Sequence, residues 1–516
     1  MLGDETSPIA ARFAELAHSN GAQPAITFRG DERKAIQTGD STLAYDFAKF
    51  WRRVERVTAH LQSTWAVQPG DRVAWLGFNH ELQLVTLVAC ARLGAVFLPL
   101  NYRLAVPELQ QVMQDAQPRL LVHDTHHTGS AQALQVERLK QTHHDTLIAN
   151  SAPRGLSLPT VHSELPLLLV YTSGTTGVPK GAVHTQAALL ANARASAWAH
   201  DFVEGDKVLS TLPMFHVGGL CIQTLPALLA GIEVVLHPRF DPSAWLDEMH
   251  TSRPTLSLLV PATMRAVFEH PRWADTSLAC LRGIMTGSST VPLAYLETLH
   301  ARGVPVGQVY GTTETGPVSI VLRLPDAMDR VGASGWPHPH AQVKLIDAQG
   351  QEVGPGETGE VCIRAANLMQ GYWSRQGNTG IGLQDGWFHS GDLGQRAEDG
   401  CITIVGRSKD MIISGGENIY PAEIENQLVT LSGVAECAVV GLSDERWGEV
   451  PVAVLVRTSD AAGQSLTSEA VLQHLQSRIA RFKLPRRVVF ITSLPKSALG
   501  KVQKPALQAQ LHGINP

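Results

Sequence analysis

The sequence predicts an α/β protein with a large N-terminal domain of layered sheets, a small β-rich subdomain and a small, mobile α+β lid domain at its C-terminal end. First, short β-type runs at 72–76 and 96–100 alternate with helical patterns at 43–62 and 81–93. This alternation is typical of partly parallel sheets covered by helices. Second, shorter strands with Gly and Pro turns begin near residue 331, and a third, independent pattern follows residue 410.

The β-rich subdomain is expected at 330–406, inside an N-terminal domain that covers 1–406. Its strands are expected at 343–346, 359–364 and 401–405. A charged link at 407–410 separates it from the lid, because a boundary is expected where one strand pattern ends and another begins. For the lid, residues 411–516, we expect helices at 421–431 and 468–478 and strands at 435–442, 452–456 and 487–491.

Composition excludes several classes of protein. The chain has 516 residues, 44% of them hydrophobic and 17% charged, which is enough for more than one core. A formal net charge of −5 gives no basic footprint for nucleic acid, so no nucleic-acid partner is expected. The six cysteines are scattered without C-x-x-C spacing, so free core thiols in a reducing cytoplasm are expected rather than disulfides or zinc.

No membrane-spanning segment is expected. The acidic start of the chain lacks the apolar stretch of a signal peptide. The longest apolar stretch, 219–236, is interrupted by Gln223, Pro226 and Glu233, which favours a buried helix running into a strand. Peripheral membrane contact stays open, and we expect a monomer or a homodimer.

A loop rich in glycine and hydroxyl groups is the strongest local signal. Residues 171–181 read Tyr-Thr-Ser-Gly-Thr-Thr-Gly-Val-Pro-Lys-Gly, between an expected strand at 167–170 and an expected helix at 184–196. Hydroxyls and main-chain N–H groups in such a loop can hold a polyphosphate, and Lys180 adds a positive charge. The spacing differs from a P-loop, because Gly174 and Gly177 are three apart and Gly181 stands where the metal-binding hydroxyl would be.

This loop resembles the phosphate-binding loop of the adenylate-forming superfamily, which includes acyl-CoA synthetases, nonribosomal peptide adenylation domains and firefly luciferase. Similar motifs follow in the family's order, at 213–219, 286–292, 308–314, 385–394, 406–410 and 494–501, so the resemblance covers nearly the whole chain. It implies ATP, Mg²⁺ and coenzyme A as ligands. The loop residues implied in phosphate binding are Thr172, Ser173, Gly174, Thr175, Thr176, Gly177 and Lys180.

The resemblance assigns further nucleotide contacts. Tyr310 is implied to cover adenine, Thr313 to reach the α-phosphate and Glu314 to hold Mg²⁺. Asp392 is implied at the ribose hydroxyls, and Arg407 at the ribose and phosphate. Completing the nucleotide site are Gly311 and Thr312 and the loop Gly287, Ser288 and Ser289, whose serines depart from the family's commoner Gly-Ala and leave the shape of this wall open.

The acid and the thiol have their own implied residues. His216 is implied beside the substrate carboxylate, and an apolar pocket is expected from Val217, Gly218, Leu220, Val260 and Pro261. Lys501 corresponds to the family's adenylation lysine, where it would offset the repulsion between carboxylate and phosphate. Lys409 corresponds to the hinge, and Gly415, Gly416 and Trp447 to the side that faces coenzyme A.

We therefore expect an ATP-dependent acid–thiol ligase that forms an acyl-AMP, releases pyrophosphate and transfers the acyl group to coenzyme A. Medium- or long-chain fatty acids and aromatic acids are both left open as substrates. One alternative is an acyl-AMP ligase that loads a carrier-protein phosphopantetheine. The other is a noncatalytic ligand-binding homologue, since a fold does not fix a function.

Overall fold

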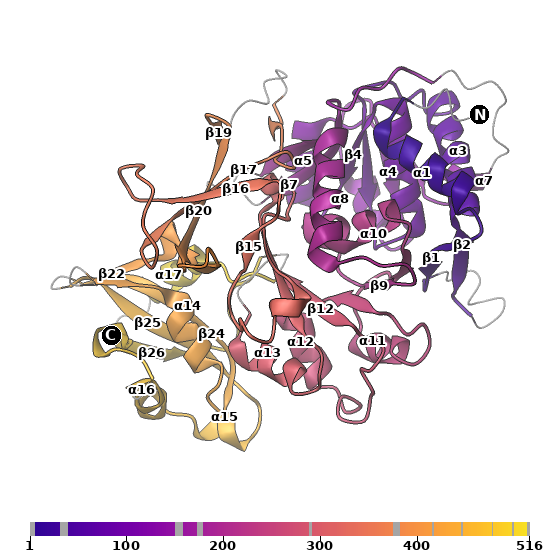
Figure 1. The fold of residues 1–516 in the computed structure, drawn as a ribbon. Coiled ribbons are helices and arrows are strands. Elements are labelled where there is room, and N and C mark those ends of the chain that lie inside the picture. The colour runs from indigo at the N-terminus through magenta and orange to yellow at the C-terminus, as the bar shows by residue number, and fades with distance from the viewer. Residues whose placement is uncertain are drawn as a thin grey trace.

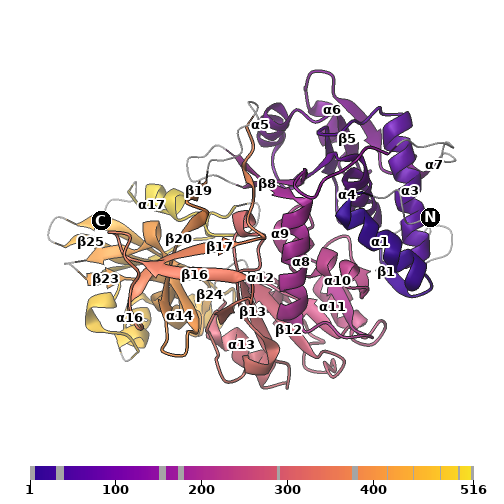
Figure 2. The same cartoon turned by 45° about the horizontal axis from the view of Figure 1, so that its top comes forward.

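The computed structural model describes residues 6–30, 40–149, 158–172, 179–287, 291–374, 382–414, 417–444, 447–476, 478–497 and 500–512. Four sheets organise this part of the chain. The indigo N-terminal elements and the orange to yellow C-terminal elements lie at opposite ends of the molecule in two views (Figures 1 and 2).

Sheet A is the largest, and its middle is parallel. The pairs β9–β10, β9–β11, β11–β12 and β12–β13 all run parallel, so their carboxyl ends share one edge. In spatial order the strands are β15 (Trp336–Pro337), β14 (Ile320–Leu322), β13 (Val306–Tyr310), β12 (Gly283–Gly287), β11 (Leu256–Leu258), β9 (Lys207–Ser210), β10 (Glu233–Leu236), β1 (Pro24–Phe28) and β2 (Leu43–Asp46).

Sheet B combines a parallel core with an antiparallel hairpin. Strands β3, β4 and β5 pair in parallel, whereas β7 and β8 form the hairpin that flanks the glycine-rich loop. In spatial order the strands are β18 (Gly371–Tyr372), β8 (Lys180–Thr185), β7 (Pro166–Thr172), β4 (Val96–Pro99), β3 (Arg72–Leu76), β5 (Leu120–His123) and β6 (Lys140–His143).

Two smaller sheets follow. Sheet C contains β16 (Ala341–Ile346), β17 (Thr358–Ala365), β20 (Trp387–Arg396), β19 (Leu383–Gln384) and β21 (Ile402–Arg407). Sheet D contains β23 (Glu417–Ile419), β22 (Ile412–Ser414), β25 (Gly448–Arg457), β24 (Val434–Asp444) and β26 (Arg487–Phe490). A short 3₁₀ helix, Ser408–Asp410, followed by Met411, connects the last strand of sheet C to the first strand of sheet D.

The helices cover the sheets. Around sheets A and B lie α1 (Pro8–Ser19), α3 (Phe47–Ser63), α4 (Glu81–Leu93), α5 (Val106–Ala116), α6 (Thr128–Ala133), α7 (Thr146–Ala149), α8 (Gln186–His200), α9 (Val217–Gly219), α10 (Leu225–Leu229), α11 (Pro242–Glu248), α12 (Pro261–Phe268) and α13 (Leu293–His300). A π-helix at Leu220–Thr224 joins α9 to α10. The C-terminal part carries α14 (Pro421–Leu428), α15 (Ala461–Ser465), α16 (Ser468–Gln476) and α17 (Lys504–His512).

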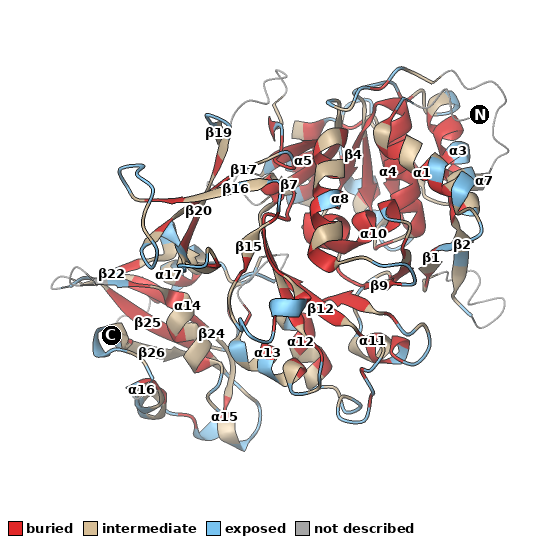
Figure 3. Ribbon diagram, viewed as in Figure 1, coloured by how far each residue is buried: buried red, intermediate tan, exposed pale blue. Residues whose placement is uncertain are grey.

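Burial follows this layering. One apolar cluster joins sheets A and B through α4, α8 and α10, with Ile26, Trp75, Val88 and Leu228 in its interior. The C-terminal part has cores of its own, one of which includes Val439. Figure 3 shows the buried residues concentrated in the central strands and in α4 and α10. The fold class expected from the sequence is therefore confirmed.

Two local expectations were wrong. Residues 43–46 form strand β2 instead of the first turn of a helix, and α3 begins only after Asp46, whose side chain accepts a hydrogen bond from the Lys49 N–H at 2.6 Å. Likewise, the glycine-rich loop leads into strand β8, and α8 starts after Thr185, which caps it. In both cases an antiparallel partner strand overrides the helical pattern.

All six cysteines are free thiols; four of them are buried, whereas Cys280 and Cys437 are partly exposed. Within the described ranges, the structure contains no helix with the length and apolar character needed to span a bilayer.

Candidate active site

The candidate site lies at the carboxyl edge of sheet A. His216 follows β9, Val260 follows β11, Gly287 ends β12 and Tyr310 ends β13. Because these strands are parallel, residues that are distant in sequence meet at one edge, where ligands bind in open α/β sheets. Gly287 is required there, since a Cβ at this position would lie 2.6 Å from the Val309 carbonyl oxygen.

A carboxylate from sheet C joins this edge. The Asp392 side chain is buried, and its Oδ2 atom accepts a hydrogen bond from the Tyr310 hydroxyl at 2.8 Å. Its Oδ1 atom lies 2.7 Å from Nε of Arg407, which pairs with it across β20 and β21. Burial and the negative charge of Asp392 raise the pKa of the Tyr310 hydroxyl well above its usual value, so the hydroxyl stays a donor.

A second carboxylate, that of Glu314, accepts a hydrogen bond from Tyr372, a residue that the sequence analysis did not single out. The Tyr372 hydroxyl on β18 donates to Oε1 of Glu314 at 2.7 Å. The Lys180 ammonium lies 5.3 Å from the centre of the same ring. Tyr372 thus connects the start of β8 with the turn that carries Glu314, and burial raises its pKa, so that it remains a donor.

The turn that carries Thr313 and Glu314 is rigidly supported. It is a 3₁₀ helix, Thr313–Thr315, and the buried Asn367 amide donates to the carbonyls of Thr315 and Val318 at 2.8 Å each. At Gly311, a Cβ would lie 1.8 Å from the Pro317 carbonyl oxygen, so only glycine fits. These contacts fix the direction of the Glu314 carboxylate.

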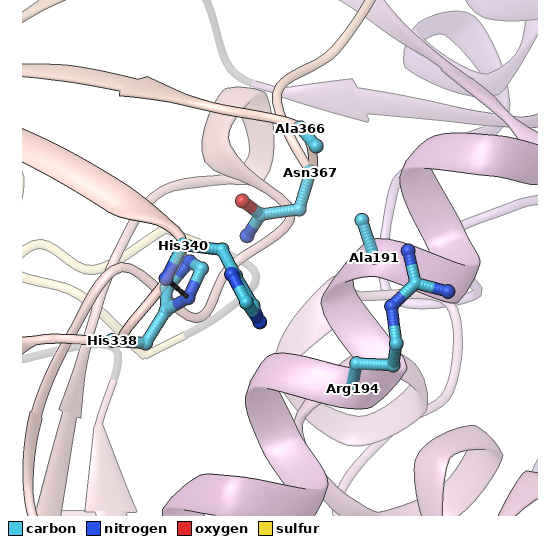
Figure 4. A pocket seen from close by; sticks show the side chains of 6 residues that line it. All are labelled: Ala191, Arg194, His338, His340, Ala366 and Asn367. Carbon is cyan, nitrogen blue, oxygen red and sulfur yellow. Dashed lines mark hydrogen bonds between the residues drawn. The ribbon is translucent and has the colours of Figure 1, made fainter.

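A cavity of about 290 Å³ adjoins this support. Figure 4 shows Asn367 and Ala366 on one side, His338 and His340 below them, and Ala191 and Arg194 of α8 opposite. Asn367 therefore both lines the cavity and supports the turn that carries Glu314.

The Lys501 side chain reaches the same group of charges from the C-terminal part of the chain. The residue is accessible to solvent, yet the protein atoms around its ammonium replace part of its hydration, and this desolvation lowers its pKa. The positive charge of Arg407 lowers this pKa further, whereas the negative charges of Asp392 and Glu314 oppose the shift. Lys501 therefore lies within electrostatic range of all three residues.

His216 lies within electrostatic range of Lys501 and is followed by the apolar residues of the expected acid pocket. Burial, together with the nearby Lys501 charge, lowers the pKa of His216 to about 4, so the ring is neutral at pH 7. Its Nδ1 atom accepts a hydrogen bond from the Gly218 N–H at 3.0 Å, which leaves the ring proton on Nε2. Val217 and Leu220 are buried in the main core, and Val260 packs against it.

A direct contact crosses from the N-terminal part to the C-terminal part. The Arg265 guanidinium on α12 donates to the main-chain carbonyl of Ala435 on β24. Burial opposes the charge of Arg265, but the ion pair with Glu269 raises its pKa, and the negative charge of Glu436 on β24 adds a smaller contribution. This contact joins the two parts of the chain in the arrangement in which Lys501 lies near the site.

The structure thus brings together Lys501, His216, Glu314, Tyr310, Asp392 and Arg407. Lys409 lies in the exposed 3₁₀ helix between sheets C and D. Trp447 is 36% exposed on the turn between β24 and β25, with the Arg486 guanidinium 5.3 Å from its ring centre. Ser173, Gly174, Thr175, Thr176, Gly177, Ser288, Ser289, Gly415 and Gly416 lie outside the described residues.

Sequence reasoning missed Tyr372 and Asn367. Each is a single residue that reaches its partners from 49 to 58 positions away, with no local motif around it. A periodic pattern could not have identified them, because their roles depend on how β18 and the segment after β17 fold back onto the turn.

Comparisons with known proteins agree with this geometry. A family model described as an AMP-binding enzyme matches residues 17–373, and one described as the AMP-binding enzyme C-terminal domain matches residues 423–501. The chain is 44% identical over 484 residues to the indoleacetate–CoA ligase of Aromatoleum aromaticum, covering 92% of this chain and 94% of that protein.

Two further relatives support the same relationship. A feruloyl-CoA synthase from an Amycolatopsis species is 41% identical over 471 residues, covering 91% of this chain and 94% of that protein. The o-succinylbenzoate CoA synthetase of Bacillus subtilis, solved in complex with its acyl-adenylate intermediate, superposes with a TM-score of 0.84 at 28% identity. This superposition covers 96% of this chain and 97% of the other.

Proposed function

The chain belongs to the family of AMP-binding enzymes and is an AMP-forming acid–CoA ligase, and we propose that its substrate is an aromatic carboxylic acid. In the first step a carboxylate oxygen attacks the α-phosphorus of ATP, and the bond to the bridging oxygen of the β-phosphate breaks. The products are an acyl-AMP and pyrophosphate. In the second step the sulfur of coenzyme A attacks the acyl carbon and expels AMP.

The position of Lys501 is the single observation that carries the assignment of the first step. Its ammonium lies within electrostatic range of Asp392, Glu314 and Arg407, and its own charge acts on His216. A lysine there would lie between the incoming carboxylate and the α-phosphate, where it offsets the repulsion of two anions as charge moves in the transition state. We assign it as the residue that promotes adenylation.

His216 is proposed to orient the acid. Its Nε2–H group is a donor, because Nδ1 is already engaged by Gly218, and the buried Val217 follows it directly in the chain. A neutral ring suits this role, since it hydrogen-bonds the carboxylate without forming a strong ion pair that would reduce its nucleophilicity. We assign the walls of the acid pocket to Val217, Gly218, Val260 and Pro261.

ATP is proposed to bind along the edge of sheet A. Tyr310, Gly311 and Thr312 would flank adenine, Thr313 would contact the α-phosphate, and Asp392 with Arg407 would hold the ribose. Lys180, with Thr172 and the loop residues Ser173, Gly174, Thr175, Thr176 and Gly177, would hold the outer phosphates. Gly287, Ser288 and Ser289 would form the remaining wall.

The donor set beside the phosphates fits a magnesium ion. Glu314 offers a carboxylate oxygen, the ligand type that Mg²⁺ prefers, and only its Oε1 atom receives the Tyr372 hydrogen bond. When bound, Mg²⁺ supplies positive charge to the phosphate oxygens. The residues of the chain orient it: Tyr372 aims the carboxylate and Asn367 fixes the turn behind it.

The second step is assigned to a different arrangement of the C-terminal part. We propose residues 1–406 as the adenylation domain, with the β-rich subdomain at 330–406, residues 407–410 as a hinge centred on Lys409, and residues 411–516 as a rotating lid. Rotation would withdraw Lys501 and bring Gly415, Gly416 and Trp447 to coenzyme A. The exposure of Trp447 in the present arrangement supports this second use.

The free cysteines support a cytoplasmic location.

The aromatic substrate is supported by two relatives above 40% identity, whose names specify indoleacetate and a feruloyl product. The test is acid-dependent pyrophosphate release with indoleacetate, ferulate, benzoate, octanoate, palmitate and glycine, each with and without coenzyme A. We expect kcat/KM to be highest for an aromatic acid and release to be accelerated by coenzyme A. A highest value for octanoate or palmitate would overturn the aromatic assignment.

A further inference from the structure

A group of histidines lies at the carboxyl ends of three parallel strands in sheet B. Strands β3, β5 and β6 pair in register, with Leu76 beside His123 and His123 beside His143. The ring centres of His123 and His143 are 5.8 Å apart, those of His143 and His144 4.4 Å, and those of His80 and His144 4.3 Å. None of these residues has a role in the ligase reaction described above.

Three of these side chains have the geometry of a metal site. One carboxylate, Asp145, faces two imidazoles: its Oδ2 lies 3.1 Å from Nδ1 of His143 and its Oδ1 lies 3.6 Å from Nε2 of His144. With metal–ligand bonds of 2.0–2.1 Å, neighbouring ligand atoms in a tetrahedral site lie about 3.3 Å apart. The two separations, each to a different oxygen of the Asp145 carboxylate, lie on either side of this value. With one ligand atom taken from each residue, all three atoms lie within 4.8 Å of one another.

The surroundings add a second, independent feature. Nε2 of His143 lies 3.0 Å from the Thr125 hydroxyl, on the ring edge opposite to the one that faces Asp145. Metal-binding histidines commonly use the second ring nitrogen in this way, which fixes the tautomer and leaves Nδ1 as the acceptor. In this structure Nδ1 of His143 accepts a long hydrogen bond of 3.4 Å from the Asp145 N–H, which a bound ion would replace. His143 and Asp145 are about one-quarter exposed, so an ion can reach them from solvent.

We propose that His143, His144 and Asp145 bind a divalent transition metal of the Zn²⁺ type. Two nitrogens and one carboxylate oxygen suit such an ion better than Mg²⁺, which prefers oxygen ligands. The fourth position would be filled by water or by Nε2 of His80, whose Nδ1 is already engaged by the Leu82 N–H.

Glu360, Cys362 and His389 form another such group in the described part of the chain. Sγ of Cys362 lies 3.5 Å from Nδ1 of His389. Burial raises the pKa of the Cys362 thiol to about 11, so an ion would first have to displace its proton. We therefore use a variant of this group, Cys362→Ser, as a control in the test of the proposed site.

The test is titration of the full-length, tag-free, EDTA-treated protein with Co²⁺, followed by visible absorption and calorimetry. We expect one Co²⁺ per chain with the intense absorption of a tetrahedral site, displaced by Zn²⁺. His144→Ala and Asp145→Asn should lose this binding, whereas Thr125→Val should weaken it by about 10- to 100-fold. Cys362→Ser and His250→Ala, which changes an exposed histidine, should bind like the parent chain.

Three results would overturn the proposal: no saturable binding, unchanged binding in Asp145→Asn, or loss of binding in Cys362→Ser. Circular dichroism of each variant separates loss of the site from loss of the fold. Thr125→Val keeps the test meaningful if the histidine variant does not fold, because it removes only the hydroxyl beside His143.

Discussion

The Nε atom of Arg407 lies 2.7 Å from Oδ1 of Asp392 at the end of sheet C, and the other carboxylate oxygen accepts the Tyr310 hydroxyl. A buried carboxylate is stable only when its oxygens are satisfied, and here both have a partner. The same pair forms part of the surroundings of Lys501. The ribose side of the proposed ATP site and the adenylation lysine are therefore electrostatically coupled.

Asp392→Asn is expected to raise the KM for ATP by about 10- to 100-fold, since hydrogen bonds to a charged group contribute about 1.5–3 kcal/mol. The KM for the acid should change little. Steady-state pyrophosphate release with varied ATP measures the effect. Asp399→Asn is the matched control, because the Asp399–Arg330 ion pair is exposed, and it should leave the KM for ATP unchanged.

Lys501→Ala is expected to reduce acyl-AMP formation by about 100- to 1,000-fold, the usual cost of removing one group that stabilises transition-state charge. Thioester formation from supplied acyl-AMP should be preserved. Single-turnover measurement of each half-reaction separates the two steps. The control is Lys496→Ala, whose ammonium pairs with Glu436 at 2.7 Å; equal losses in both half-reactions of Lys501→Ala would contradict its assignment to adenylation.

Tyr372→Phe removes the hydroxyl that aims Glu314 while keeping the ring beside Lys180. We expect the Mg²⁺ concentration for half-maximal activity to rise by about tenfold, because the lost hydrogen bond is to a charged group. Activity titrated with Mg²⁺ at saturating ATP is the measurement. Tyr171→Phe, which removes the hydroxyl that donates to Asp115 at 2.5 Å, serves as comparison. An unchanged Mg²⁺ requirement in Tyr372→Phe would exclude this role.

Stability should decrease as pH falls from 7 to 5. His200 is fully buried, and burial lowers its pKa to about 4, below the unfolded value of about 6.5. The unfolded chain therefore binds more protons in this window, so the free energy of unfolding rises with pH and levels off above pH 7. One such group accounts for about 2 kcal/mol between pH 5 and pH 7.

His200→Gln should reduce that pH dependence. The measurement is the midpoint of thermal unfolding at pH 5, 6 and 7, where the difference between pH 5 and pH 7 should be smaller in the variant than in the parent. His250→Gln changes an exposed histidine and should leave the difference as it is. A parallel shift at all pH values would mean that His200 contributes packing alone.

Much of the candidate site could be predicted because its residues lie in short motifs. Tyr310 and Glu314 share one motif, and Asp392 and Arg407 face each other across one strand pair. Lys501 followed from its motif as well, and the structure places it near these groups. For Tyr310 and Glu314 local sequence carries this information because the carboxyl ends of the parallel strands of sheet A meet at one edge.

The rest depends on tertiary packing. Residues 43–46 have a helical pattern, yet strand β1 recruits them as its antiparallel neighbour. Tyr372 lies on a two-residue strand that pairs with β8, and its hydroxyl reaches Glu314 only through that pairing. The Asn367 amide donates to two carbonyls, and these come within its reach only after the turn has formed.

The contact between Arg265 and Ala435 has an evolutionary consequence. Its acceptor is a main-chain carbonyl, which every amino acid carries. Substitutions at position 435 therefore leave the acceptor in place, whereas a change of Arg265 removes the donor. The hydrogen bond between the two parts is therefore kept when residue 435 changes. Relatives should tolerate variation at position 435 far more readily than at position 265.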